Sequence, residues 1–410
     1  MKTILVLPGS YWQIALIRKI KEMGHKVLVV NPYENSPCFP YADGHLQSDI
    51  LDTKQVMTYA EENKIDAVMS DECDIIMTAI ARIGEKFGLS SLDTASASLY
   101  TDKFLMREFC KQHGLKYPAY RLCKTADDAI SLLKEIGRPL IIKPLDCNAS
   151  KGVFKVESED DIRKHFEVSM AFSSIEKSVL AERFIEGTEF TVDGVKTPSA
   201  HYTLAISEKK HFKHNLSIAD ELLFSHSNDR FNYEKLIETN NNFVMQSGLK
   251  YGFTHAEYKC EDGEYYLIEI AARGGGNMIS SVITQYMSGY DTYRYLVECA
   301  LGNVYDYDFS IQNDYKDRAA VLKFFKTPEG GGKVKDIHGL DYLDNEPDIV
   351  KYMLNFKIGD TIQDAVSDSA RIGFYIACSE NLQKLKEIMG QVEKGFSIEL
   401  EKENVQRKAF

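Results

Sequence analysis

The chain has 410 residues, of which 44% are hydrophobic and 27% are charged, and its formal net charge is −12 at pH 7. This length favours two or three domains, and the hydrophobic fraction excludes wholesale disorder. The acidic balance argues against non-specific nucleic-acid binding, which needs a basic surface. We find neither the apolar run of a signal peptide nor the roughly twenty apolar residues of a membrane span.

The eight cysteines are scattered and form no Cys-x-x-Cys pair. Such spacing is typical of reduced thiols in a protein core, and neither a disulfide framework nor a zinc site is expected. We therefore expect a cytoplasmic protein whose partners are small molecules, with no nucleic acid and no membrane. A homodimer is the default assembly for such a protein.

The first ninety or so residues alternate between predicted strands and predicted helices. Apolar runs predict strands at 2–7, 26–30 and 65–69, and helical periodicity predicts helices at 12–23, 53–63 and 74–87. This alternation predicts a small parallel α/β sheet.

The first strand-to-helix turn, Pro8–Trp12, holds one glycine where a dinucleotide fold has Gly-x-Gly-x-x-Gly. A nicotinamide site is therefore disfavoured there. Asp71, Glu72 and Asp74 follow the third strand, at the end of such a sheet where ligands bind. Helix capping and substrate contact are equally good interpretations of these acids.

From about residue 94 the pattern changes to α+β with antiparallel sheets. We predict helices at 102–113, 233–247 and 380–395, and strands at 119–123, 139–144, 152–156, 178–184, 189–195, 252–260 and 264–270. Gly330–Gly332 marks a turn between short C-terminal strands. The predicted domains are 1–93, 94–310 and 311–410.

The strands at 252–260 and 264–270 flank Asp262-Gly263, a pair typical of hairpin turns. If the pairing is centred on that turn, the carboxylates of Glu257 and Glu269 approach each other across the two strands. Two facing carboxylates on an apolar background repel unless a cation lies between them, and Mg²⁺ accepts such ligands. In the alternative interpretation, one glutamate points to solvent on the opposite face.

Three glycines, Gly274, Gly275 and Gly276, come soon after Glu269, between Arg273 and Asn277. Glycines let the backbone approach a ligand closely, and an arginine can hold a carboxylate or phosphoryl group with two hydrogen bonds. Beside a carboxylate pair, this segment predicts a binding site for such a group.

The predicted strand at 139–144 is apolar but carries Lys143. A buried ammonium needs a partner, so we expect Lys143 to face an anion. The polar turn Asp146–Gly152 follows, and its amides, with Ser150 and Lys151, could bind phosphate oxygens. An ordinary hairpin loop is the alternative interpretation of this turn.

A further strand, turn and strand cover Val179–Phe190. Its acids could accept hydrogen bonds from an adenine amino group and from ribose hydroxyls. The alternative is a plain surface hairpin.

These pieces, in this order, resemble the ATP-grasp superfamily over most of the chain. The resemblance implies α/β plus α+β architecture: an N-terminal Rossmann-like (pre-ATP-grasp) parallel sheet, a central ATP-grasp domain of two α+β subdomains with its lid at about 117–185, and a small C-terminal α+β domain. The implied ATP contacts are Lys103, Lys143, Ser150, Lys151, Gly152, Glu182, Arg183, Phe184, Ile185, Glu189, Glu257, Ile268 and Glu269. The implied metal ligands for Mg²⁺ are Glu257 and Glu269. The implied substrate contacts are His255, Arg273, Gly274, Gly275, Gly276 and Asn277, with Arg273 in the catalytic role.

Within the superfamily the chain is similar to the carbamoyl-phosphate-synthetase-like branch that includes the L-amino acid ligases, through His255-x-Glu257 and Gly331-Gly332-Lys333-Val334. It departs from that branch at Ala271, where an asparagine metal ligand is usual; Asn277 or water could fill that place. The covering loop 146–152 also has fewer glycines than is normal.

The resemblance implies an ATP- and Mg²⁺-dependent ligase that activates a carboxylate as an acyl phosphate and joins it to an amine. The alternatives are a bicarbonate-activating carboxylase of the same fold, a non-catalytic ATP-binding module and, less favoured, a nicotinamide oxidoreductase. The basic stretch 207–214 could attract an anionic substrate, but a solvated hairpin tip is the favoured interpretation.

Overall fold

The computed structural model describes residues 1–147, 151–174 and 176–401. They divide into two compact units. The first holds the described residues within Met1–Asn148, Gly152–Ser207 and His226–Lys316, and the second holds Lys151 and those within Glu208–Ser225 and Asp317–Phe410. The finer division into three domains stays a prediction. None of the helices in the described ranges combines the length and apolar character that crossing a bilayer requires.

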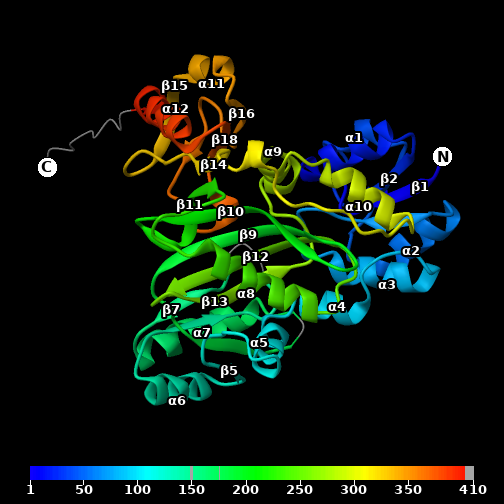
Figure 1. Cartoon of the computed structure of the whole chain (residues 1–410). Coiled ribbons are helices and arrows are strands. Elements are labelled where there is room, and N and C mark those ends of the chain that lie inside the picture. Colours follow the sequence, from blue (N-terminus) through cyan, green and yellow to red (C-terminus); the bar gives the residue numbers. More distant parts are fainter. Residues whose placement is uncertain (148–150, 175, 402–410) are drawn as a thin grey trace, which may run out of the picture. The chain divides into compact units, whose positions relative to one another are not determined.

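The N-terminal part of the first unit is a parallel sheet of order β3-β2-β1-β4 (Figure 1). Its strands are β1 (Thr3–Val6), β2 (Lys26–Asn31), β3 (Gly44–Gln47) and β4 (Ala67–Met69). Helix α1 (Ile14–Glu22) packs on one face of the sheet, and α2 (Thr53–Glu62) and α3 (Met77–Phe87) pack on the other. The predicted parallel α/β sheet is confirmed. Strand β3 escaped prediction because its Gly-His-Leu-Gln sequence has one large apolar residue.

A second, antiparallel sheet of the first unit has the order β5-β8-β6-β7. Its strands are β5 (Tyr120–Cys123), β6 (Leu140–Lys143), β7 (Phe154–Val156) and β8 (Val179–Arg183). Helices α6 (Ala126–Ile136) and α7 (Glu159–Ala171) pack on this sheet (Figure 1). All four strands were predicted, whereas both helices were missed.

The third sheet region of this unit has the order β13-β12-β9-β10. The strands are β9 (Thr188–Lys196), β10 (His201–Phe212), β12 (Gly252–Glu261) and β13 (Glu264–Ala271), and β10 continues into the second unit. Helices α5 (Lys103–Gln112) and α8 (Tyr233–Gln246) supply Met106, Cys110, Leu236 and Phe243 to one core with this sheet. The remaining helices of the unit are α4 (Thr94–Leu99), α9 (Thr284–Ser288) and α10 (Thr292–Ala300), and a π-helical turn covers Ile279–Ile283.

The second unit contains antiparallel strands in the order β11-β14-β18-β16 and a three-stranded sheet in the order β17-β15-β19. Their bounds are β11 (Asn215–Ser225), β14 (Ala319–Phe324), β15 (Gly332–His338), β16 (Ile349–Leu354), β17 (Thr361–Ile362), β18 (Gly373–Ser379) and β19 (Ser397–Leu400). Helices α11 (Leu340–Asn345) and α12 (Leu382–Gly395) complete it. The predicted final helix is confirmed, and its apolar stripe buries Leu385, Ile388 and Val392. Short 3-10 turns occur at Tyr11–Gln13, Phe39–Tyr41, Asn313–Tyr315 and Asp368–Ala370.

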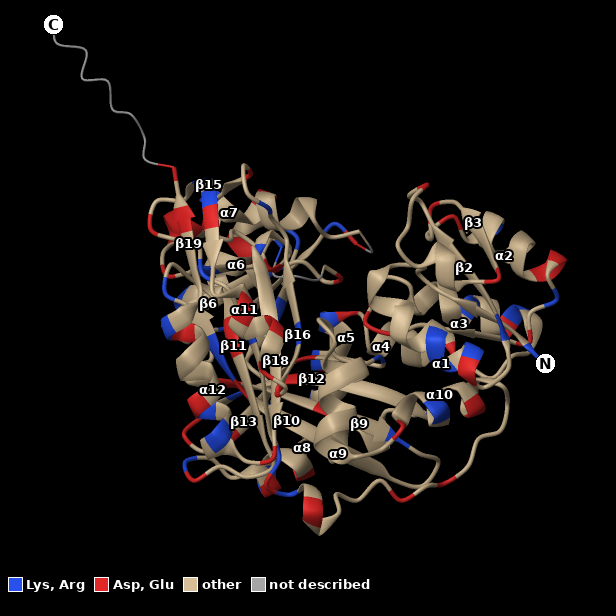
Figure 2. Ribbon diagram, turned by 90° about the horizontal axis from the view of Figure 1, so that it is seen from above, with Lys and Arg blue, Asp and Glu red and all other residues tan. Residues whose placement is uncertain are grey.

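Acidic and basic positions are interspersed on exposed helices such as α1 and α12 (Figure 2). All eight cysteines lie in the described ranges and are free thiols, as the scattered spacing predicted.

Candidate functional site

The β12–β13 hairpin brings the two predicted metal ligands together. Asp262 and Gly263 both take left-handed backbone angles, φ +52° and +75°, which closes a tight turn. Glu257 is the direct cross-strand partner of Glu269. An unbroken register from the Asp262-Gly263 turn would pair Glu257 with Ile268, and the irregularity between Glu257 and Tyr258 moves the pairing by one residue. Directly opposed residues project to the same side of a sheet. The two carboxylates therefore share one face, while Ala256 on the other face is buried.

Lys103 binds one member of this pair. It is the first residue of α5, after Asp102, whose side chain accepts hydrogen bonds from the amides of the first turn. The Lys103 Nζ lies 2.8 Å from Glu269 Oε1 and 2.9 Å from the carbonyl oxygen of Cys147. Burial acts to lower the pKa of Lys103, but the charge and hydrogen bond of Glu269 outweigh it and raise that pKa. Lys103 is thus a permanent cation beside Glu269.

Lys143 is held by a second buried carboxylate. Its Nζ lies 2.6 Å from Glu182 Oε2, and Arg107 Nε donates to Glu182 Oε1 at 2.5 Å. Burial, opposed by Glu182 and reinforced by the like charges of Arg107 and Lys103, lowers the pKa of Lys143 to about 8. Lys143 faces an anion, as predicted, and that anion is Glu182.

Arg273 holds a carboxylate of the protein itself. Its Nε and Nη2 donate to the two oxygens of Asp74 at 2.7 and 2.6 Å, and its Nη1 donates to the Gly274 carbonyl at 2.7 Å. Burial acts to raise the pKa of Asp74, but Arg273 outweighs it and the pKa is lowered. The bidentate geometry expected for a ligand is therefore present, with Asp74 as the anion.

Asp71 and Glu72 anchor the glycine segment that follows Arg273. Asp71 accepts hydrogen bonds from Ser280 Oγ at 2.6 Å, Tyr293 Oη at 2.5 Å and the Gly274 amide at 3.0 Å. The Glu72 carboxylate accepts from the Met278 amide at 3.2 Å. Burial raises the pKa of Asp71, and burial together with Asp71 raises the pKa of Glu72 well above its usual range. The acids after the third strand thus have structural partners of their own.

The glycines of this segment differ in what surrounds them. A Cβ on Gly275 would lie 2.6 Å from Asp193 Oδ1 and 2.9 Å from His255 Nδ1, which are themselves paired at 2.8 Å. A Cβ on Gly274 would meet Ser280 and Asp71, whereas one on Gly276 would meet nothing within 4 Å. Gly274 and Gly275 are therefore required by packing within the protein, and only Gly276 is open to a ligand. Asn277 follows with a left-handed φ of +54°.

The residues predicted to contact adenine and ribose lie at the end of β8 and the start of β9. Arg183 pairs with Glu261 at 2.8 Å. The Phe184 ring carries two ammonium groups, Lys155 Nζ at 4.8 Å and Lys259 Nζ at 4.7 Å from its centroid. Ile185 is buried, and Glu189, also buried, lies 3.9 Å from Lys259. Lys155 also pairs with Glu157 at 2.6 Å, so each of the two ammonium groups has a carboxylate as well as the ring beside it.

Of the predicted covering loop, 146–152, the described residues are 146, 147, 151 and 152. Ser150 lies outside the described residues, so its predicted role has no structural counterpart. Lys151 is exposed, and Gly152 is buried with a φ of +72°. The Ser174 amide donates to Asp146 at 3.0 Å, which ties the start of the loop to the end of α7.

Electrostatic interactions link four charged residues of the predicted site, Lys103, Lys143, Glu269 and Arg273. Lys103 acts on the pKa of Lys143, Asp74 acts on that of Lys103, and Glu269 acts on that of Arg273.

Arg107, which belongs to this group of charges, was not predicted from the sequence. A basic residue four positions after Lys103, on the same helical face as buried Met106 and Cys110, was the available signal.

One cavity of about 50 Å³ lies behind Arg273 and is lined by Ser70, Ile80, Phe253 and Ala300 among others. It can hold a few water molecules but no nucleotide, since ligand pockets measure roughly 300–1,000 Å³. Ser70 Oγ, which has no hydrogen-bond partner in the described structure, lies on its wall.

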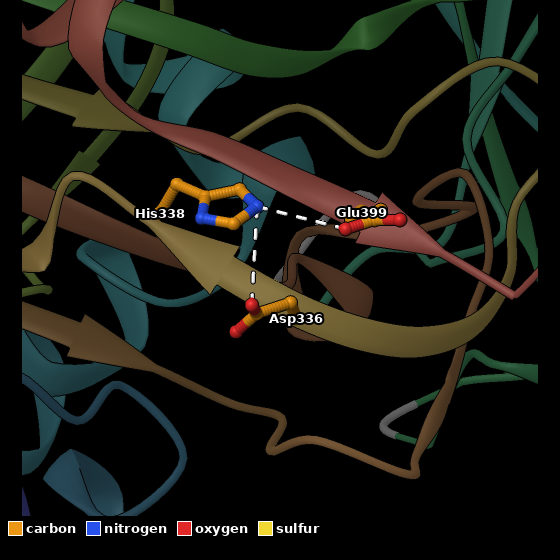
Figure 3. Close-up of side chains that lie close together, drawn as sticks. All are labelled: Asp336, His338 and Glu399. Atoms are coloured by element: carbon orange, nitrogen blue, oxygen red, sulfur yellow. Dashed lines mark ion pairs between the residues drawn. The ribbon is translucent and has the colours of Figure 1, made fainter.

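A separate cluster lies on β15 and β19 of the second unit, where His338 is 4.0 Å from Asp336 and 3.7 Å from Glu399 (Figure 3). All three side chains are exposed, and Glu399 also pairs with Lys335 at 2.5 Å. Exposed groups of this kind pair readily without a metal, so we assign no metal centre here.

Comparison with known proteins places two segments in families. The model described as the ATP-grasp domain matches residues 136–282, and that described as L-amino acid ligase C-terminal domain 2 matches residues 324–401. Residues 136–282 are therefore an ATP-grasp domain, and residues 324–401 are the C-terminal domain found in L-amino acid ligases. The resemblance to the ATP-grasp superfamily and to its L-amino acid ligase branch is confirmed in these segments.

Among curated relatives are the formate-dependent phosphoribosylglycinamide formyltransferases of Maridesulfovibrio salexigens and Bacillus subtilis. They are 28% and 25% identical over 188 and 187 residues, which is 45% of this chain and 48% of each relative. The chain thus spans about half the length of these relatives in the match.

Solved structures share the fold over nearly the whole chain. The L-amino acid ligase from Bacillus licheniformis has a TM-score of 0.84 at 18% identity, covering 98% of this chain and 99% of that chain. The phosphoribosylglycinamide synthetase from Anaerococcus prevotii has a TM-score of 0.75 at 19% identity, covering 98% and 100%. The predicted architecture, α/β plus α+β, is confirmed.

Proposed function

We propose that this chain is an ATP-dependent ligase that activates a carboxylate as an acyl phosphate and joins it to an amine. The observation that carries the proposal is the cross-strand pair Glu257–Glu269, with the cation Lys103 on one carboxylate. Lys143 and Arg273 are electrostatically coupled to the same group of charges. Such an arrangement suits a polyphosphate and its counter-ion.

The relatives support this class of reaction. One is named as an L-amino acid ligase, and others are named as formate-dependent, formate being a carboxylate. A related structure, the N5-carboxyaminoimidazole synthetase of Staphylococcus aureus, is described as a complex with ADP. We infer ATP use by this chain from its ATP-grasp domain, which covers residues 136–282.

The residues present fit a magnesium ion. Glu257 and Glu269 would hold it, because two facing carboxylates form a donor set that Mg²⁺ accepts together with phosphate oxygens. A bound magnesium ion would neutralise part of the phosphate charge. Ala271 is buried where the branch usually has a metal-ligating asparagine. We therefore propose that the protein supplies two metal ligands at this hairpin.

The proposed chemistry has two steps. A substrate carboxylate oxygen attacks the γ-phosphorus, the bond to the bridging oxygen breaks, and ADP leaves with the electron pair. The amine nitrogen then attacks the acyl carbon, the carbon–oxygen bond to phosphate breaks, and the amine loses a proton. Lys103 and Lys143 would hold the phosphates during the first step, and Arg273 would bind the transferring group or the carboxylate. Residues 146–152 would exclude water from the acyl phosphate.

The remaining assignments form part of the same proposal. Arg183, Phe184, Ile185 and Glu189 would contact the nucleoside, Ile268 would lie against it, and His255, Gly276 and Asn277 would contact the substrate. A cytoplasmic location agrees with the free thiols. We retain the homodimer as a proposal that light scattering of the purified protein would test.

The test is release of ADP by purified protein with Mg²⁺, against a panel of amino acids, dipeptides, small organic acids and bicarbonate. We expect release that needs one acid and one amine and that falls at least about a hundredfold in Glu269→Gln, because one metal ligand and the partner of Lys103 are both weakened. The control is Glu264→Gln on the same strand, whose partly exposed carboxylate pairs with Lys116 and Lys235. It should keep full activity.

Turnover that is equal in Glu269→Gln and Glu264→Gln would contradict the proposal. Release stimulated by bicarbonate alone would replace it with the carboxylase interpretation.

A further inference from the structure

Arg107 lies entirely inside the first unit and joins three elements. Its side chain is 0% exposed. From α5 it donates through Nε to Glu182 Oε1 on β8 at 2.5 Å, and through Nη2 to the Ile268 carbonyl on β13 at 2.6 Å. A planar guanidinium can make both bonds at once, whereas an ammonium cannot reproduce this fork. Arg107 thus fixes the carboxylate of Glu182 and the strand position next to Glu269.

The group formed by Arg107, Glu182 and Lys143 has an excess of positive charge. Glu182 Oε2 binds Lys143 Nζ at 2.6 Å, and none of the three side chains is more than 5% exposed. Two cations thus share one anion in a buried place, which is costly unless another anion compensates. In the described part of the chain, Arg107 Nη1 also has no hydrogen-bond acceptor. Both observations indicate that an anion belongs beside this group.

We propose that Arg107 is a positioning residue of the nucleotide site, which holds Glu182 and the Ile268 carbonyl so that Lys143 is directed at the nucleotide phosphates. The inference rests on the proposed function, because it requires a nucleotide next to Lys143. Arg107 is buried and acts through Glu182. Lys143 is the only one of the two cations that can lose its charge near neutral pH, since an arginine remains protonated.

The charges that act on Lys143 come from two elements: Glu182 on β8, and Arg107 and Lys103 on α5. The neighbouring strand β7 and helix α7 direct their nearby ionisable groups elsewhere. Lys155 lies over the Phe184 ring, and His165 stacks on Phe154. Burial and the two like charges lower the pKa of Lys143 to about 8, so a bound polyphosphate would return a proton to it.

The experiment measures Mg-ADP binding by calorimetry from pH 6.5 to 9.5, in buffers of different ionisation enthalpy, for full-length wild type, Arg107→Met and Arg107→Lys. We expect wild-type affinity to fall as the pH rises through about 8, with proton uptake on binding. Arg107→Met should bind Mg-ADP at least about tenfold more weakly at pH 7. The pH at which its affinity falls to half should move upward, because a like charge beside Lys143 is gone. Arg107→Lys should bind more weakly with the midpoint unchanged, because the charge stays and the fork is lost.

Lys143→Arg and Arg121→Met serve as controls. The first removes the titrating amine, so the pH dependence near 8 should vanish. The second breaks the exposed pair of Arg121 with Glu135 and should change nothing. Thermal unfolding shows which variants fold. If Arg107→Met does not fold, Arg107→Lys still provides the test.

If both Arg107 variants fold and bind Mg-ADP with wild-type affinity and with the wild-type pH midpoint, the positioning role of Arg107 is overturned. The proposed function is not affected by that result. A weaker affinity in Arg107→Met without any change of midpoint or proton uptake would reduce Arg107 to a structural residue and overturn the inference. A wild type that binds no Mg-ADP would contradict the proposed function and the inference with it.

Discussion

At the scale of single residues, the segment after Arg273 shows how strongly the protein's own packing limits the site. The Cα of Gly275 lies against Asp193 and His255, which are paired with each other at 2.8 Å, so that a Cβ there would come within 2.9 Å of both. The neighbouring Gly276 has free space on its Cα. Three consecutive glycines look alike in the sequence, yet only their surroundings decide which of them a side chain would disturb.

The pair Gly275→Ala and Gly276→Ala tests this difference. A methyl group at 275 would have to displace Asp193 or His255, and we expect it to lower the free energy of unfolding by about 1–3 kcal/mol. Gly276→Ala should stay within about 0.5 kcal/mol of wild type, because nothing lies within 4 Å of its added carbon. Urea unfolding of both variants checks the prediction. Equal losses at the two positions would contradict it.

Residue-scale prediction from the sequence had a clear limit. Lys143, Glu257 and Glu269 could be found because each is a charged residue in an apolar or hairpin context, whereas Lys103 followed only from the resemblance to the ATP-grasp superfamily. That Glu182 and Asp74 would serve as the partners of Lys143 and Arg273 could not be found, since these pairs join segments far apart in the chain. Partner choice depends on tertiary contacts that local patterns do not encode.

At the scale of elements, strands were easier to predict than the helices between them. The two strands and their turn followed from Asp262-Gly263 and period-two alternation, but the irregularity between Glu257 and Tyr258, which brings Glu257 opposite Glu269, did not. Helices α6 and α7 were missed although each begins with a capping box, Thr125 with Asp128 and Ser158 with Asp161. Helix α6 also has apolar residues at helical spacing, Ala129, Ile130, Leu133 and Ile136, so both signals were present there. Helix α7 has fewer apolar residues, and its cap was the stronger signal.

The cap of α7 can be tested directly. In Ser158→Ala the Asp161 amide loses its acceptor, and we expect the free energy of unfolding to fall by about 1 kcal/mol. Thr58→Ala is the matched control, since it also removes a hydroxyl that bonds to backbone, but from the exposed middle of α2. That change should be neutral or slightly stabilising, because alanine has the higher helix propensity. Chemical denaturation of both variants decides, and a loss at Thr58 as large as that at Ser158 would refute the capping argument.

At the scale of the whole molecule, one buried histidine makes stability depend on pH. His201 Nδ1 donates to Asn241 Oδ1 at 2.6 Å, Thr254 Oγ1 donates to His201 Nε2 at 2.8 Å, and burial lowers the pKa of His201 to about 4. The unfolded chain binds the proton from about pH 6.5 downward, whereas the native state binds it only near pH 4. The unfolded state thus holds more protons in this window.

Stability should therefore fall as the pH drops from 6.5 to 4, by about 1.4 kcal/mol per pH unit from this group. His201→Gln cannot titrate, so its unfolding free energy should decline less over the same window. The exposed surface variant His45→Gln should follow wild type. Urea unfolding at several pH values measures this, and parallel pH profiles for wild type and His201→Gln would exclude His201 as the source.

The fold as a whole was predictable because the order of its parts, a parallel sheet followed by antiparallel hairpins with paired glutamates, carries the ATP-grasp pattern. The acid and the amine were not predictable. Selectivity depends on side chains that tertiary structure gathers from many segments, and the glycine segment that was expected to face a ligand is largely packed against Asp71, Asp193 and His255.

The central claim, acyl phosphate formation, is tested most directly with a carboxylate substrate labelled with oxygen-18 in both oxygens. The acid and amine identified by ADP release are supplied with ATP and Mg²⁺, and the inorganic phosphate is examined by mass spectrometry. Our account predicts one labelled oxygen in each phosphate formed, because the carboxylate oxygen that attacks the γ-phosphorus leaves with it. Unlabelled phosphate, or label in AMP, would contradict that account.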